Sequence, residues 1–110
     1  MTDEQNVTWH AAIKASELEE DEAEHVKIGD TPVCIVRLED GIYAINDICS
    51  HEYALLSEGF VEDEEVECPL HQARFNVKTG ACTALPAKED VPTYRVKVEG
   101  DQVYVGMPAT

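Results

Sequence analysis

Two short segments of the chain each pair one cysteine with one histidine. The first reads CSH at residues 49–51, the second reads CPLH at residues 68–71, and sixteen residues separate them. Thiolates and neutral imidazoles are both good ligands for zinc and for iron. Two loops of this kind can close on one site from opposite sides. The pattern therefore predicts a metal site with four candidate ligands, Cys49, His51, Cys68 and His71.

Three kinds of site could use these four side chains. One zinc ion accepts two sulfurs and two nitrogens in a tetrahedron, yet zinc ribbons and fingers usually pair like with like. A cysteine nucleophile needs a base, an orienting group and an oxyanion hole, and two Cys–His pairs without a glycine-rich loop fit that poorly. Splitting each pair suits two adjacent irons better, as in a Rieske 2Fe–2S centre, because each loop can send its thiolate to one iron and its imidazole to the other. A structural Cys2His2 zinc module stays open as an alternative.

The sequence around these pairs resembles the Rieske-type ferredoxins that serve bacterial aromatic-ring dioxygenases. Residues 49–80 carry both boxes at the family's spacing, with ALLSEG after the first box and RFN and TG after the second. The likeness extends more weakly over almost the whole chain, through GIYA before the first box and LPA at residues 85–87. The chain departs from the family at Gln72, Ala73 and Asn76, where a glycine-rich turn and an aspartate are common.

The resemblance implies one 2Fe–2S cluster, with the two cysteines on one iron and the two histidines on the other. The chain shows no nucleotide motif, flavin fingerprint or mononuclear iron triad, so we expect a one-electron carrier without catalytic activity of its own. By resemblance, its partners are a flavoprotein ferredoxin reductase upstream and a terminal ring-hydroxylating oxygenase downstream. In the family the histidines lie at the exposed tip, so His51 and His71 would form the electron exit. The Rieske-type small subunit of nitrite reductase resembles the same boxes and is the alternative destination.

Short apolar runs between turn dipeptides predict an all-β fold in a single domain, residues 1–110. We expect a Rieske-like antiparallel β-sandwich base with a small inserted cluster-binding subdomain at about residues 47–87. Helix is expected only within residues 11–20, as a turn or two. The expected strands are His25–Ile28, Pro32–Leu38, Ile42–Ile45, Glu65–Glu67, Arg74–Val77, Thr93–Val98 and Val103–Val105, with turns at Gly29-Asp30, Asp40-Gly41 and Gly100-Asp101.

Acidic residues outnumber basic residues by 23 to 8, which gives a formal net charge of −15. Because this charge would repel nucleic acid and anionic lipid, neither is expected as a partner. The acids concentrate in two runs, Glu17–Glu24 and Glu62–Glu67. These runs could be a solubilising surface only, or they could form a docking face for a basic protein partner. The sequence leaves both interpretations open.

Two further features predict a cytoplasmic protein. No apolar run approaches the ~20 residues that a membrane span needs, and the N-terminus lacks the basic and apolar regions of a signal peptide. In a reducing cytoplasm, cysteines serve metal sites or catalysis more often than disulfides.

The remaining cysteines and histidines are not expected to be ligands. Cys34 lies in phase with apolar residues on a predicted strand, which predicts a buried core thiol. Cys82 follows a Thr-Gly turn and is expected to be a small packing residue. His10 and His25 stand among polar neighbours and are expected to be solvated.

Overall fold

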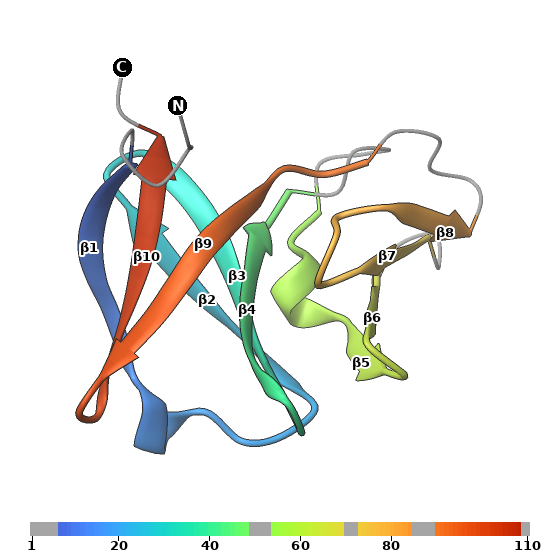
Figure 1. Cartoon of the computed structure of the whole chain (residues 1–110). Helices are drawn as coiled ribbons and strands as arrows, with labels where there is room; N and C mark the ends of the chain where they lie inside the picture. Colours follow the sequence, from blue (N-terminus) through green and yellow to red (C-terminus); the bar gives the residue numbers. More distant parts are fainter. Residues whose placement is uncertain (1–6, 49–53, 70–72, 85–89, 109–110) are drawn as a thin grey trace.

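The computed structural model of the chain describes residues 7–48, 54–69, 73–84 and 90–108 (Figure 1). These residues form ten strands and two single-turn 3₁₀ helices, and among them no helix is long and apolar enough to cross a membrane. The elements in chain order are β1 (Val7–Lys14), η2 (Ala15–Glu17), β2 (Glu22–Ile28), β3 (Thr31–Leu38), β4 (Gly41–Asn46), η3 (Leu56–Glu58), β5 (Phe60–Glu62), β6 (Glu65–Glu67), β7 (Arg74–Asn76), β8 (Cys82–Ala84), β9 (Thr93–Glu99) and β10 (Gln102–Pro108).

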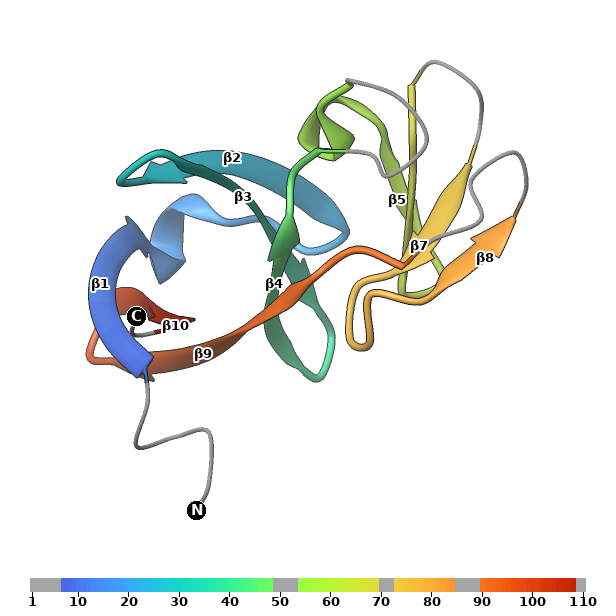
Figure 2. The same cartoon turned by 90° about the horizontal axis from the view of Figure 1, so that it is seen from above.

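The strands form two antiparallel sheets, which confirms the predicted all-β class. The larger sheet has six strands in the order β1-β10-β9-β4-β3-β2, and it curls until its two edge strands, β1 and β2, contact each other. One half of this sheet consists of β1, β10 and β9, and the other consists of β4, β3 and β2. The two halves pair with each other where the end of β4 meets the start of β9, and they form the two layers of the predicted base. The smaller sheet, β5-β6-β7-β8, lies between β4 and β9 in sequence and stands beside the base (Figure 2).

Strand β3 is buried on both faces because it separates two apolar cores. Val33 and Ile35 face the base core, whereas Cys34 and Val36 face a core shared with the small sheet. A continuous apolar run is typical of a strand covered on both sides. The base core contains Leu18, Ile28, Val33, Ile35, Ala44, Val103 and Val105. The shared core contains Cys34, Val36, Leu38, Ile45, Ala54, Leu56, Val66, Cys68, Ala73, Phe75, Val77 and Val91.

The turn or two of helix expected within residues 11–20 is present as the single 3₁₀ turn Ala15–Glu17, and the residues before it, up to Lys14, belong to β1. Helix is expected nowhere else in the chain, and the 3₁₀ turn η3 (Leu56–Glu58) corrects that expectation. Strand β1 pairs antiparallel with β10 from Val7 opposite Pro108 to Lys14 opposite Gln102. The ladder pairs backbone groups of the edge strand β1 with β10 along this segment, apart from a register shift between Ala11 and Ile13, so tertiary pairing overrides the local preference for helix.

Candidate metal centre

Cys68 is the one predicted ligand inside the described part of the chain, and it follows β6 directly. It is a free cysteine, fully buried in the shared core. Its backbone N–H donates to the carbonyl oxygen of Ala73 over 2.6 Å, which closes the base of the CPLH segment. We call the Cys68–Ala73 pair the second neck. The other three predicted ligands, Cys49, His51 and His71, lie outside the described residues.

The segment with the first Cys–His pair leaves the base after β4 and returns just before η3. Ile48 and Leu55 form an isolated antiparallel bridge across it, and we call this pair the first neck. One residue further out on each side, the N–H of Leu56 donates to the carbonyl oxygen of Asp47 over 2.8 Å. Backbone hydrogen bonding therefore holds the two ends of residues 49–53 together.

The two necks are anchored in the same core. Ala54 lies beside the first neck and Cys68 lies in the second, and both are buried in the shared core. Between them, the chain at Gly59 lies so close to β6 that an added Cβ atom would be 1.7 Å from the carbonyl oxygen of Glu67. Two loops thus start from adjacent points on one support, which is the arrangement that the paired Cys–His segments require.

The stretch that follows β8 is also closed at its base by hydrogen bonds. The N–H of Cys82 donates to Oδ1 of Asp90 over 2.9 Å, and the N–H of Val91 donates to the carbonyl oxygen of Gly80 over 2.9 Å. These bonds bring together the two ends of the stretch that contains LPA, whose residues 85–89 lie outside the described part. Cys82 is half-buried and packs against the shared core, as expected of a packing residue.

Asp47 is a fully buried carboxylate at the base of the first Cys–His segment. Its Oδ1 accepts the N–H of Ser57 at 2.7 Å, and its Oδ2 accepts the hydroxyl of Ser57 at 2.7 Å. The Nδ1 atom of His25 lies 2.6 Å from the same Oδ2. His25 and His10 are both exposed, as expected of solvated residues, but His25 also contacts Asp47. The ALLSEG motif contains Ser57, but no sequence pattern points to the partner on β2.

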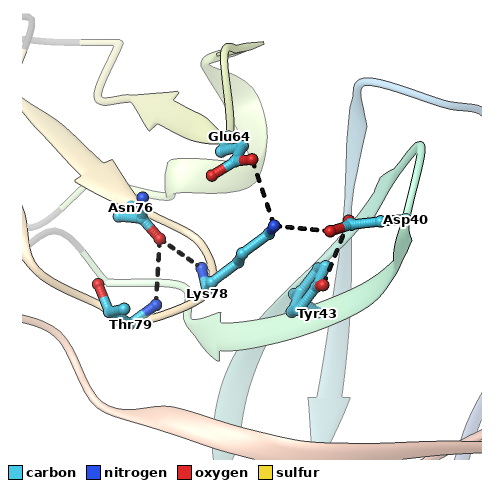
Figure 3. A network of polar contacts seen from close by, with 6 residues as sticks. All are labelled: Asp40, Tyr43, Glu64, Asn76, Lys78 and Thr79. Atoms are coloured by element: carbon cyan, nitrogen blue, oxygen red, sulfur yellow. Dashed lines mark hydrogen bonds and ion pairs between the residues drawn. The ribbon is translucent and has the colours of Figure 1, made fainter.

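Ion pairs of one lysine link the small sheet to the base (Figure 3). The Nζ atom of Lys78 lies 2.7 Å from Oδ2 of Asp40, at the β3–β4 turn, and 3.2 Å from Oε2 of Glu64, at the β5–β6 turn. It also lies 5.5 Å from the centre of the Tyr43 ring. The hydrogen bond to Asp40 is the main cause that raises the pKa of Lys78, and the same bond lowers the pKa of Asp40. No sequence pattern predicts this contact, because one lysine among 23 acids has many possible partners.

Cys34 is confirmed as a buried core thiol. Burial raises its pKa well above the ordinary value for a thiol, and the negative charge of Asp47 raises it further. Cys34 lies on β3 and packs in the shared core together with Val36, as expected of a packing residue, and it provides a matched comparison for Cys68.

The described residues fit a 2Fe–2S cluster. A free, buried thiol stands at the second neck, the first neck opens on the other Cys–His pair, and both necks rest on one apolar core. The two thiolates and two imidazoles of the two Cys–His segments match the donor chemistry of a Rieske centre. The proposed ligands on one iron are Cys49 and Cys68, and those on the other are His51 and His71.

Known proteins resemble this chain over most of its length. The anthranilate 1,2-dioxygenase ferredoxin subunit of Burkholderia cepacia is 39% identical over 107 residues, which covers 97% of this chain and 99% of the relative. The ferredoxin of carbazole 1,9a-dioxygenase from Nocardioides aromaticivorans has a TM-score of 0.85 at 38% identity and covers 89% of this chain and 96% of its own. A complex of oxygenase and ferredoxin in carbazole 1,9a-dioxygenase contains a chain with a TM-score of 0.85 at 32% identity. The match covers 93% of this chain and 95% of that one.

The alternative destination has a structural counterpart at lower identity. A structure described as a putative NADH-dependent nitrite reductase small subunit from Mycobacterium tuberculosis has a TM-score of 0.84 at 25% identity, covering 94% of this chain and 98% of its own. The family description "Rieske 2Fe-2S domain" matches residues 8–95. The chain therefore belongs to the Rieske family, and its cofactor is one 2Fe–2S cluster of the Rieske type.

Proposed function

We propose that this protein carries single electrons from an NAD(P)H-dependent flavoprotein ferredoxin reductase to a terminal aromatic-ring-hydroxylating oxygenase. The observation that carries the proposal is a pair of Cys–His segments, closed at two necks over one buried core, in a chain similar along almost its whole length to a dioxygenase ferredoxin. The dioxygenase relative is 39% identical and the nitrite reductase neighbour is 25% identical. The role of a dioxygenase ferredoxin is therefore favoured over that of a nitrite reductase subunit.

The proposal assigns each part of the chain a role in electron transfer. Residues 47–87 serve as the cluster-binding part of one domain, residues 1–110, and Cys49, His51, Cys68 and His71 hold the cluster. The bound cluster supplies one-electron chemistry at a potential above that of plant-type ferredoxins, because two neutral imidazoles replace two anionic thiolates. The buried position of Cys68 excludes water from its side of the site. The protein has no catalytic activity of its own and acts in the cytoplasm.

A reconstituted electron-transfer chain tests this function. Iron–sulfide reconstitution should give a red-brown protein with about two irons and two sulfides per chain. Under anaerobic conditions NADH and the reductase should bleach its visible absorbance, and oxygenase, oxygen and aromatic substrate should then restore it and yield hydroxylated product. Omitting this protein is the control. A colourless protein that holds one zinc, or a loaded protein that supports nitrite reduction but no ring hydroxylation, would contradict the proposal.

The structure brings the two acidic runs together, which sharpens the question of a docking face. A groove of about 340 Å³ between the base and the small sheet is lined by Glu20 and Asp21 from the first run and by Asp63 and Glu64 from the second. Clustered charge of one sign steers a partner of the opposite sign and raises the rate of association. Within the second run, Arg74 forms ion pairs with Glu62 and with Glu65, as Lys78 does with Glu64, so only part of the run is uncompensated.

We expect the variant Glu20→Gln, Asp21→Asn and Asp63→Asn to be reduced by the reductase about tenfold more slowly at low salt, because steering is lost. The matched control removes three exposed acids that lie outside both runs, by Asp30→Asn, Glu58→Gln and Glu99→Gln. Stopped-flow reduction across a salt series compares the two variants. Above physiological ionic strength, where the Debye length is below about 8 Å, the rates should converge. Equal rates at low salt would leave the acids as a solubilising surface.

A further inference from the structure

We infer that His25 is a positioning residue for the 2Fe–2S cluster: through Asp47, it fixes the base of the loop that carries Cys49 and His51. The inference rests on the proposed ligand set. It concerns a residue of β2 that lies 22 positions before Asp47 and belongs to neither Cys–His segment.

Asp47 is held in place by hydrogen bonds from several partners. Its carboxylate is fully buried and accepts three side-chain and backbone contacts, two from Ser57 and one from His25. Its own N–H donates to the carbonyl oxygen of Pro32 over 3.0 Å, and its carbonyl oxygen accepts the N–H of Leu56. Every polar group of Asp47 thus has a partner, as a buried carboxylate requires. All of these contacts together fix the position of Asp47.

These partners come from two different parts of the fold. Ser57 and Leu56 lie on the far side of residues 49–53, so their bonds tie the two ends of that segment to each other. His25 lies on β2 of the base, so its bond ties the joined ends to the larger sheet. The His25 imidazole is 42% exposed, which leaves Asp47 as the buried member of the pair.

A carboxylate oxygen only accepts hydrogen bonds, so a ring hydrogen on Nδ1 of His25 is what this contact requires. Removal of His25 leaves Oδ2 with the Ser57 hydroxyl alone, although the carboxylate stays buried. A buried charge with too few donors favours an opened neck that admits water. Such opening is local, because it needs the first neck to separate and leaves the base strands paired.

Three variants test this inference in the loaded protein at one fixed pH. His25→Leu removes the donor, His25→Asn places an amide N–H near the position of Nδ1, and His10→Leu alters an exposed histidine on β1 as the matched control. We expect His25→Leu to release iron to a chelator on the order of tenfold faster than wild type in native buffer. Amide hydrogen exchange at Leu56 and Ser57 should accelerate with it. The other two variants should stay close to wild type.

The same measurements can overturn the inference. If His25→Leu releases iron and exchanges its amides at wild-type rates, His25 is not a positioning residue for the cluster. A faster release that His25→Asn fails to rescue, and that follows only a lowered denaturant midpoint of the whole chain, would make the role merely structural. If His25→Leu does not fold, Ser57→Ala removes the other donor to Oδ2 and should also speed release; an unchanged rate would count against the inference. A wild type that takes up no iron would overturn the proposed function as well, whereas equal rates in loaded proteins overturn this inference alone.

Discussion

Replacing Cys68 by serine is expected to abolish cluster binding, so that less than about one-tenth of the wild-type iron is retained after reconstitution. The cluster is held by thiolates, and a serine hydroxyl does not ionise near neutral pH to take the place of one. Cys68 also stands in the second neck and is fully buried, so no nearby exposed side chain can easily replace it. Iron analysis and the visible and electron paramagnetic resonance spectra measure the loss.

Cys34→Ser is the matched control for this prediction. Both cysteines are fully buried in the shared core, and both variants exchange a sulfur for an oxygen. Cys34→Ser should keep two irons and the wild-type spectrum, with a loss of about 1–3 kcal/mol in unfolding free energy from the buried hydroxyl. If Cys68→Ser retained the wild-type spectrum, or if Cys34→Ser lost its iron while folded, the ligand assignment would be wrong.

Gly59→Ala is expected to lower the free energy of unfolding by about 3 kcal/mol, among the largest effects of any change of one methyl group in this chain. The backbone of Gly59 has φ −93°, which any residue adopts, so the cost is purely one of space. The new Cβ atom would lie 1.7 Å from the carbonyl oxygen of Glu67, so backbone has to move. The movement would separate η3 from β6, and we expect iron retention to fall as well.

Gly100→Ala separates the steric cost of an added Cβ atom from the conformational cost of a positive φ angle, which is the other reason why a position requires glycine. Gly100 has φ +62° at the β9–β10 turn, and a Cβ atom there meets nothing within 4 Å. Its cost is conformational only, about 1 kcal/mol, and cluster binding should be unchanged. Guanidinium unfolding of both variants, with and without iron, gives the comparison. Equal losses in the two variants would mean that the contact between Gly59 and Glu67 relaxes at little cost.

The sequence predicted the elements whose signals are local. β3 was recognisable from a continuous apolar run, β6 was placed at Glu65–Glu67, and three turns were read from their glycines. The predicted strand Arg74–Val77 ends one residue early, at Asn76. The strands β5 and β8 were not predicted, because each has three residues and is defined by its neighbours in the small sheet rather than by its own composition.

The residues of the candidate site likewise fall into two groups, those with a local sequence signal and those without one. The four proposed ligands follow from residue type and spacing, and Cys34 follows from its phase on a strand, so these positions can be predicted from the sequence alone. The contact between His25 and Asp47 spans 22 positions, and the contact between Lys78 and Asp40 spans 38. Neither has a motif, because each depends on how β2 and the small sheet are brought to the base in three dimensions.

The two-sided burial of β3 has a thermodynamic consequence. Val33 and Ile35 on one face and Cys34 and Val36 on the other belong to a single strand, so neither core can come apart without loosening the other. A ligand that binds only the folded state adds its binding free energy to the stability of everything that unfolds with its site. Occupancy of the metal centre is therefore coupled to the melting of the base strands that enclose the other core, and we expect iron content and chain stability to rise and fall together.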